Sequence, residues 1–148
     1  MIIYKKGDIF QSDADCYVNP VNTIGVTDKG LIRQFRDKFP INHRQYMAAC
    51  AKDLIQMGRL FIVHNEAESR QYIINFPTKR HWGDKSEMKW VISGLIDLRQ
   101  LIDTYHIQSI AIPALGSGYE GLQWKEVKQH IEDILGAIPD VEVEVYEP

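Results

Sequence analysis

Short apolar runs that alternate with longer stretches of helical periodicity limit the fold of this 148-residue chain more than any other feature. A run without polar alternation, such as Ser109 to Pro113, is typical of a strand in a sheet that is covered on both faces. The expected strands span residues 2–5, 15–20, 60–63, 72–76, 109–113 and 141–146. Because helical segments separate most of these strands, we expect a three-layer α/β/α sandwich with a mixed, mostly parallel central sheet.

Four helices are expected from apolar residues at helical spacing. The first begins after Gly30 and ends before Pro40. Asn42 is expected to cap the second helix, which would turn Tyr46 and Met47 inward. The other two helices are expected at residues 88–105 and 124–137.

The last expected strand, residues 141–146, alternates apolar residues with Glu142 and Glu144. This alternation predicts a position at the edge of the sheet. Charged side chains there would discourage pairing with another molecule.

Composition and charge restrict the class of protein. A content of 45% hydrophobic and 25% charged residues is typical of a globular domain, and the length fits one domain over residues 1–148. The net charge of −3 gives no global positive field that would attract nucleic acid. It does not exclude a local cluster of basic residues around a binding site. Two cysteines and no Cys/His pair at zinc spacing predict no disulfide framework, metal site or cofactor. Without a signal peptide or a long apolar run, we expect a cytoplasmic location.

The segment Phe76-Pro77-Thr78-Lys79-Arg80-His81-Trp82 follows an expected strand and is the first candidate for a binding site. In open α/β sheets, ligands bind outside the carboxyl ends of the strands. Lys79 there can clamp a phosphate or, as a neutral amine, attack an anomeric carbon and open a glycosidic bond through a Schiff base. The alternative for the segment alone is a solvated basic turn. Trp82 can be a core or rim residue, or it can stack on a base.

Two glycine-rich loops, residues 25–30 and residues 116–121, follow other expected strands. Glycines let the backbone approach a pyrophosphate, and successive N–H groups form an anion nest, although two glycines can equally form only a turn. The Gly116-Ser117-Gly118 pattern matches neither a P-loop nor the dinucleotide-binding fingerprint. We expect both loops to converge with Lys79 on one nucleotide-like ligand.

Four further polar residues are candidates, each with a structural alternative. The amides of Asn19 and Asn22 suit vicinal ribose hydroxyls, and turn formation is the alternative; for Asn22, which faces the glycine loop, we favour the ligand role. Asp8 can accept from an exocyclic amine, but on local evidence a turn is favoured. Glu120 can be the acid/base partner of Lys79 or an exposed loop residue.

Together these segments resemble those of macrodomains, the ADP-ribose-binding fold, over nearly the whole chain. The resemblance rests on Gly7-Asp8-Ile9, residues 18–26, Lys29-Gly30, residues 76–82 and residues 113–118. The Phe-Pro-Thr-Lys-Arg-His-Trp string is similar to DarG-type antitoxin macrodomains, which remove ADP-ribose from thymidine bases in DNA. The wider branch resembles the human terminal ADP-ribose glycohydrolase, which frees glutamate side chains with a lysine and an aspartate. The resemblance implies an ADP-ribosyl hydrolase that acts on thymidine in single-stranded DNA as a monomer and reverses a DarT-like toxin.

The resemblance also implies roles for individual residues. Asp8 would hold the adenine amine with Ile9 beside it, and Asn22 would face the distal ribose. Lys79 would be the catalytic lysine, and Glu120 stands where the human enzyme has its catalytic aspartate. The rest of the ADP-ribose site is expected at Asn19, Gly25, Val26, Lys29, Gly30, Thr78, Gly116, Ser117, Gly118 and Tyr119. Arg80 and His81 would contact DNA phosphate.

Two residues depart from the family pattern. Asp28 stands where the family loop usually has the first glycine of Gly-Lys-Gly, and it adds negative charge near the distal ribose or its leaving group. Glu120 stands where DarG-like relatives often have glycine. Two alternatives to DNA hydrolysis therefore stay open: hydrolysis of ADP-ribosylated glutamate on proteins, and a module that binds ADP-ribose without turnover.

Overall fold

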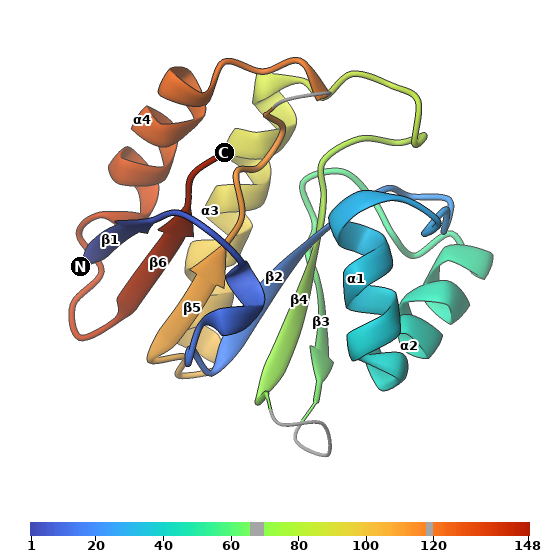
Figure 1. Ribbon diagram of the computed structural model, residues 1–148, viewed down its shortest axis with the longest axis horizontal. Helices are drawn as coiled ribbons and strands as arrows, with labels where there is room; N and C mark the ends of the chain where they lie inside the picture. The colour runs from blue at the N-terminus through green and yellow to red at the C-terminus, as the bar shows by residue number, and fades with distance from the viewer. Residues whose placement is uncertain (66–69, 118–119) are drawn as a thin grey trace.

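The computed structural model describes residues 1–65, 70–117 and 120–148, and its strands form a six-stranded sheet (Figure 1). The strands are β1 (Ile2–Lys5), β2 (Cys16–Val21), β3 (Phe61–His64), β4 (Tyr72–Pro77), β5 (Ser109–Ile112) and β6 (Glu142–Tyr146). They lie in the order β1-β6-β5-β2-β4-β3, and every neighbouring pair is parallel except β3 with β4. The expected mixed, mostly parallel sheet is confirmed.

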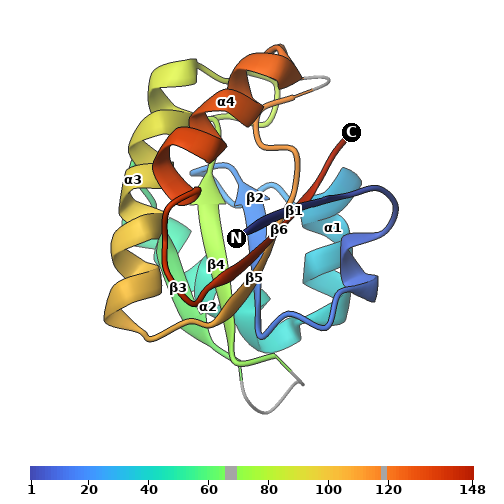
Figure 2. The same ribbon diagram turned by 90° about the vertical axis from the view of Figure 1, so that its left-hand side faces the viewer.

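Helices cover both faces of this sheet. They are α1 (Gly30–Lys38), α2 (Pro40–Ala51), α3 (Met88–Thr104) and α4 (Trp124–Leu135), with a short 3-10 helix η1 (Ile9–Gln11) after β1. Figure 2 shows α3 and α4 together on one side of the sheet and α1 on the other. The three-layer arrangement follows from these positions. Within the described ranges, no helix has the length and apolarity that crossing a membrane requires.

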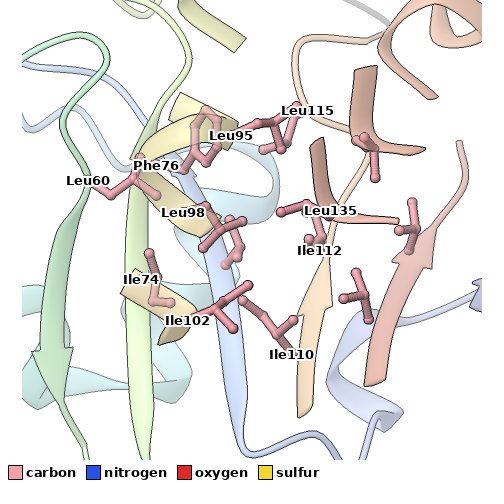
Figure 3. Packing of buried hydrophobic residues seen from close by; sticks show 14 of the residues in the cluster. Leu60, Ile74, Phe76, Leu95, Leu98, Ile102, Ile110, Ile112, Leu115 and Leu135 are labelled. Atoms are coloured by element: carbon pink, nitrogen blue, oxygen red, sulfur yellow. The ribbon is translucent and has the colours of Figure 1, made fainter. Parts of the chain in front are cut away.

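The larger part of the core lies between the sheet and the pair α3 and α4 (Figure 3). Ile74 and Phe76 of β4 and Leu95 and Leu98 of α3 are completely buried there. Burial of each such side chain stabilises the fold by about 1.5–3 kcal/mol. Gly94 lets α3 approach β4 closely, because a Cβ atom at this position would lie 2.3 Å from Cζ of Phe76. This packing fixes the strand that leads into the candidate site.

Aromatic rings fill part of the opposite face. Phe10, Tyr17, Phe35 and Phe39 have ring centroids 4.9 to 6.4 Å apart, and several pairs meet edge to face. Such pairs contribute about 0.5–1.5 kcal/mol beyond the area that they bury. The cluster holds η1 and α1 against β2.

The expected edge position of the last strand is wrong. β6 pairs with β1 on one side and β5 on the other, so β1 and β3 form the edges of the described sheet. Glu144 is buried: its carboxylate lies 2.7 Å from the Lys5 ammonium and accepts hydrogen bonds from Ser12 and Tyr146. The alternation in β6 gave the wrong position because it shows only that Glu144 is polar. It does not show that Lys5 and Ser12, which are distant in the sequence, are its partners.

The second helix also differs from the expectation. Pro40 is its first residue and Phe39 precedes it, so Asn42 is not its cap. Proline suits this position because a first-turn N–H has no helical partner to lose. Asn42 is instead buried, and it exchanges side-chain hydrogen bonds of 3.1 and 2.8 Å with Asn75 of β4. Met47, which was expected to face inward, is 38% exposed.

Candidate active site

Two adjoining cavities, each of about 660 Å³, lie outside the carboxyl ends of the strands. The first lies among the segment after β2, the start of α1 and the segment after β4. The second lies beside η1 and the ends of β5 and β6. Because Pro20, Leu31, Ser117 and Glu120 line both, the two form one elongated groove. The segments that follow β2 and β4 lie above the strands in Figure 1.

Lys79 and Glu120 lie together in the first cavity. Nζ of Lys79 is 3.8 Å from Oε1 of Glu120, and both side chains are largely shielded, with 20% and 17% of their surface exposed. The hydroxyl of Thr78 donates a 2.6 Å hydrogen bond to the same carboxylate oxygen. The candidate amine and the candidate acid/base group are therefore held side by side, facing the same space.

Ser86, which the sequence gave no reason to select, fastens this pair to the loop after β4. Its hydroxyl lies 2.7 Å from the carbonyl oxygen of Thr78 and 3.1 Å from Oε1 of Glu120. Its backbone N–H donates to the carbonyl of Glu120 at 2.9 Å. The backbone N–H of Thr78 in turn donates to Val21 at 2.9 Å, which joins the ends of β2 and β4. This role could not be predicted from the sequence, because a single serine in a polar segment belongs to no recognisable motif.

The side chain of Asn22 shapes the loop after β2. Its Oδ1 accepts from the backbone N–H groups of Ile24, Gly25 and Val26 at 2.9 to 3.2 Å, and its Nδ2 donates to the carbonyl of Val26 at 2.8 Å. The hydroxyl of Tyr46 lies 2.7 Å from the carbonyl oxygen of Asn22 and 3.2 Å from Oδ1. Burial raises the pKa of Tyr46 well above its usual value, so this hydroxyl stays protonated and donates. Asn22 lines the first cavity, and most of its polar capacity is used within the loop.

The rest of this loop divides between the cavity and the protein interior. Val26, Lys29 and Gly30 line the first cavity. Gly25 has a positive φ of 81°, and a Cβ atom there would lie 3.0 Å from the sulfur of Met47. Gly25 is therefore required by the backbone turn and by its packing on α2.

Asn19 lies inside the sheet and not in the groove. It is 2% exposed, and its Nδ2 donates to Oδ1 of Asn75 at 3.1 Å. Asn75 also exchanges hydrogen bonds with Asn42, so the three amides form a buried network that joins β2, β4 and α2. Oδ1 of Asn19 has no hydrogen-bond partner among the described residues. Asn19 therefore helps to hold β2 against β4 and does not line the groove.

Asp8 and Ile9 lie at the other end of the groove, in the second cavity. One oxygen of Asp8 accepts from the backbone N–H of Phe10 at 2.9 Å and caps η1. Gly7, with a φ of 108°, makes the turn that brings Asp8 there. The carboxylate of Asp8 therefore forms the turn before η1, and Asp8 also lines the second cavity.

Gly116 and Ser117 follow β5, and Ser117 lies where the two cavities adjoin. Ser117 lines both cavities, and its hydroxyl finds no hydrogen-bond partner in the described part of the chain. Gly116 has a positive φ of 70°, and a Cβ atom there would lie 2.5 Å from Leu122. Gly118 and Tyr119, two of the expected ligand-binding residues, lie outside the described residues.

The lining of the first cavity includes an aromatic ring and charged side chains of both signs. The ring of Trp82 lines this cavity, and the ammonium of Lys29 lies 5.2 Å from its centroid. Arg80 is exposed and places its guanidinium 5.3 Å from the ring of Trp90. His81 is exposed and begins the turn that Asp84 closes. Arg80 and His81 are thus exposed, and neither lines the cavity as their sequence neighbours Lys79 and Trp82 do.

Comparison with known proteins identifies the family. A family model described as the Macro domain matches residues 18–131. A DNA ADP-ribosyl glycohydrolase of Thermus aquaticus is 43% identical over 149 residues, covering 100% of this chain and 41% of that protein. One from Mycobacterium tuberculosis is 38% identical, covering 100% of this chain and 42% of that protein. The chain spans about two fifths of the length of these relatives.

Solved structures agree with this similarity. The macrodomain of Thermus aquaticus DarG superposes with a TM-score of 0.95 at 43% identity, covering 100% of this chain and 99% of that one. The structure of Thermosipho africanus DarTG in complex with ADP-ribose gives a TM-score of 0.91 at 32% identity, covering 99% of this chain and 41% of that one. The expected resemblance to DarG-type macrodomains is confirmed, and the chain belongs to the Macro domain family.

Proposed function

We propose that this macrodomain hydrolyses the bond between the distal ribose of ADP-ribose and a thymidine base in single-stranded DNA. The observation that carries the proposal is the Lys79–Glu120 pair in the first cavity of a groove that continues into a second cavity of similar volume. The similarity to proteins named DNA ADP-ribosyl glycohydrolase supports the choice of substrate.

The groove suggests how ADP-ribose would lie. Adenine would occupy the second cavity, where the other oxygen of Asp8 can accept from its exocyclic amine. The diphosphate would cross the middle, near Ser117 and the amino end of α1, since helix amino ends and glycine-rich loops favour anions. The distal ribose would then reach the first cavity beside Lys79 and Glu120.

The proposed chemistry uses the amine of Lys79 as a nucleophile. It attacks the anomeric carbon of the distal ribose, the bond from that carbon to the base breaks, and the base leaves with the proton that the amine gives up on forming its new bond. The ribose ring opens to an iminium ion on Lys79. Glu120 takes a proton from water, the water adds to the iminium carbon, and the lysine is released with free ADP-ribose.

A second candidate function rests on Glu120 itself. A carboxylate 3.8 Å from the catalytic amine resembles the lysine and aspartate pair of the enzymes that free ADP-ribosylated glutamate on proteins. The same residues would then act on an ester in place of a base. A module that binds ADP-ribose without turnover is the third candidate, and it would leave Lys79 as a binding residue only.

Partners and location follow from the proposed substrate. Arg80 and His81 would contact DNA phosphate from the outer surface. A relative in Thermosipho africanus is a DNA ADP-ribosyl transferase–glycohydrolase fusion, 33% identical over 141 residues, which supports a DarT-like toxin as the partner whose modification is reversed. The chain would then act in the bacterial cytoplasm, as an antitoxin.

The test is a comparison of two substrates under the same conditions. Purified protein and its Lys79→Ala variant are incubated with a thymidine-ADP-ribosylated oligonucleotide and with a glutamate-ADP-ribosylated protein, and released ADP-ribose is measured. Lysine-dependent release from DNA alone is the expected result. Release from the protein alone would move the assignment to the second candidate. Binding without release from either substrate would leave a binding module.

A further inference from the structure

Trp82 is the largest exposed side chain at the mouth of the first cavity, with 54% of its surface accessible. A single exposed aromatic ring is ordinary on a protein surface, so exposure alone assigns no role. Trp82, however, lines the same cavity as Lys79 and Glu120. With the distal ribose placed as proposed above, the group attached to it would lie in the cavity that Trp82 lines.

The loop that carries Trp82 is held in place. The backbone N–H and the hydroxyl of Thr23 both donate to the carbonyl of Arg80, at 3.0 and 2.9 Å. The backbone N–H of Asp84 donates to the carbonyl of His81 at 3.1 Å. Both ends of the turn are tied, so the ring is presented on a fixed backbone, and little conformational entropy is lost when it packs on a ligand.

The charges around the ring favour neither sign. Lys29 and Lys85 line the cavity with Asp28 and Asp84. A purely electrostatic clamp for a phosphate is therefore weak here, and the indole face is the group with the most contact area to offer. Flat bases stack on such a face, whereas a glutamate side chain has no aromatic ring to stack.

We propose that Trp82 is a base-stacking subsite: its indole packs on the nucleobase that carries ADP-ribose. Lys29, 5.2 Å from the ring centroid, lies against the platform and adds a positive charge beside the base. This inference rests on the proposed function and deepens it, since it names the group that selects a nucleobase conjugate over free ADP-ribose or a protein conjugate.

The experiment measures binding without turnover. In a Lys79→Ala background, dissociation constants are measured by calorimetry for free ADP-ribose and for ADP-ribosyl-thymidine, with Trp82 intact and as Trp82→Ala, Trp82→Phe and Trp82→Leu. With Trp82 intact, the thymidine conjugate should bind about tenfold more tightly than free ADP-ribose, a factor within the range for one stacked base. The alanine and leucine variants should lose this preference, the phenylalanine variant should keep most of it, and free ADP-ribose should bind all four alike.

A matched control is Tyr105→Ala, which removes another exposed ring, 37% accessible, just after α3. It should leave the preference unchanged. An unchanged preference in Trp82→Ala, or an equal loss of affinity for both ligands, would overturn the stacking subsite. Because this readout needs no catalysis, it stands apart from the proposed function, which fails separately if wild-type protein releases nothing from ADP-ribosylated DNA.

Discussion

Nζ of Lys79 lies 3.8 Å from Oε1 of Glu120, an oxygen that also accepts the hydrogen bond from Thr78. One oxygen of Glu120 thus faces the amine of Lys79. The hydroxyl of Thr78, the residue before Lys79, holds this oxygen in position. The catalytic proposal depends on this arrangement, because a proton-transfer group must be within reach of the reacting atoms and must be oriented.

Glu120→Gln should slow the release of ADP-ribose by about 10²-fold, the lower end of what general acid/base groups contribute. The amide keeps the size of the side chain and can still accept from Thr78, but it cannot take a proton from water. Affinity for ADP-ribose should change little, and single-turnover release with calorimetry would separate the two effects. Wild-type release by Glu120→Gln would make Glu120 an ordinary loop residue.

Thr78→Val should lower the release rate by about tenfold, since a hydrogen bond to a charged group is worth more than one between neutral groups. Valine matches the shape of threonine but removes the 2.6 Å hydrogen bond that orients Glu120. Thr78→Ser is the matched control and should retain most activity. Equal rates for the valine and serine variants would show that the hydroxyl does not orient the carboxylate.

Tyr46→Phe should destabilise the fold by about 1–2 kcal/mol, because it removes the donor to a buried loop carbonyl. The same change should weaken ADP-ribose binding, since Tyr46 and Asn22 together shape the loop that lines the first cavity. Urea denaturation and calorimetry measure the two effects. Tyr4→Phe, which loses only a 2.6 Å bond to Glu132 at the surface, is the control, and a larger loss there would contradict the account.

Gly94→Ala should destabilise the protein by about 1–3 kcal/mol through overpacking. The added methyl group would lie 2.3 Å from Cζ of Phe76, a completely buried ring that has little room to move. Gly83→Ala, where a Cβ atom meets nothing within 4 Å, should be nearly neutral. Thermal unfolding of the two variants compares them directly, and equal midpoints would mean that α3 can move away from β4 at no cost.

Much of the fold could be predicted because local periodicity and strand order are strong signals in an α/β chain. All six strands lie within a residue or two of the expected segments, and the mixed, mostly parallel sheet was expected. The position of β6 could not be predicted from Glu142 and Glu144, since the Lys5–Glu144 ion pair joins opposite ends of the chain. The amides of Asn42 and Asn75 were equally hidden, because a buried polar pair is visible only once both strands and helices are in place.

For the candidate site, the sequence indicated several residues that the structure places along one groove, but it did not indicate the hydrogen bonds that hold them. Lys79, Glu120 and Ser117 line one cavity as a group, in keeping with the motifs that drew attention to them. The supporting roles of Ser86 and Tyr46 arise from contacts across the fold, and neither residue belongs to a motif. Such residues cannot be identified from motif spacing in the sequence. They become evident only from the hydrogen bonds in the folded structure.

The measurement that tests the central claim most directly separates binding from turnover at Lys79. ADP-ribose affinity and the release rate from a thymidine-ADP-ribosylated oligonucleotide are measured for wild type and Lys79→Ala. The account predicts affinity within about threefold of wild type and no detectable release, because Lys79 forms a bond in the reaction and is not required to hold the ligand. Release by Lys79→Ala at the wild-type rate, or loss of binding and release together, would contradict it.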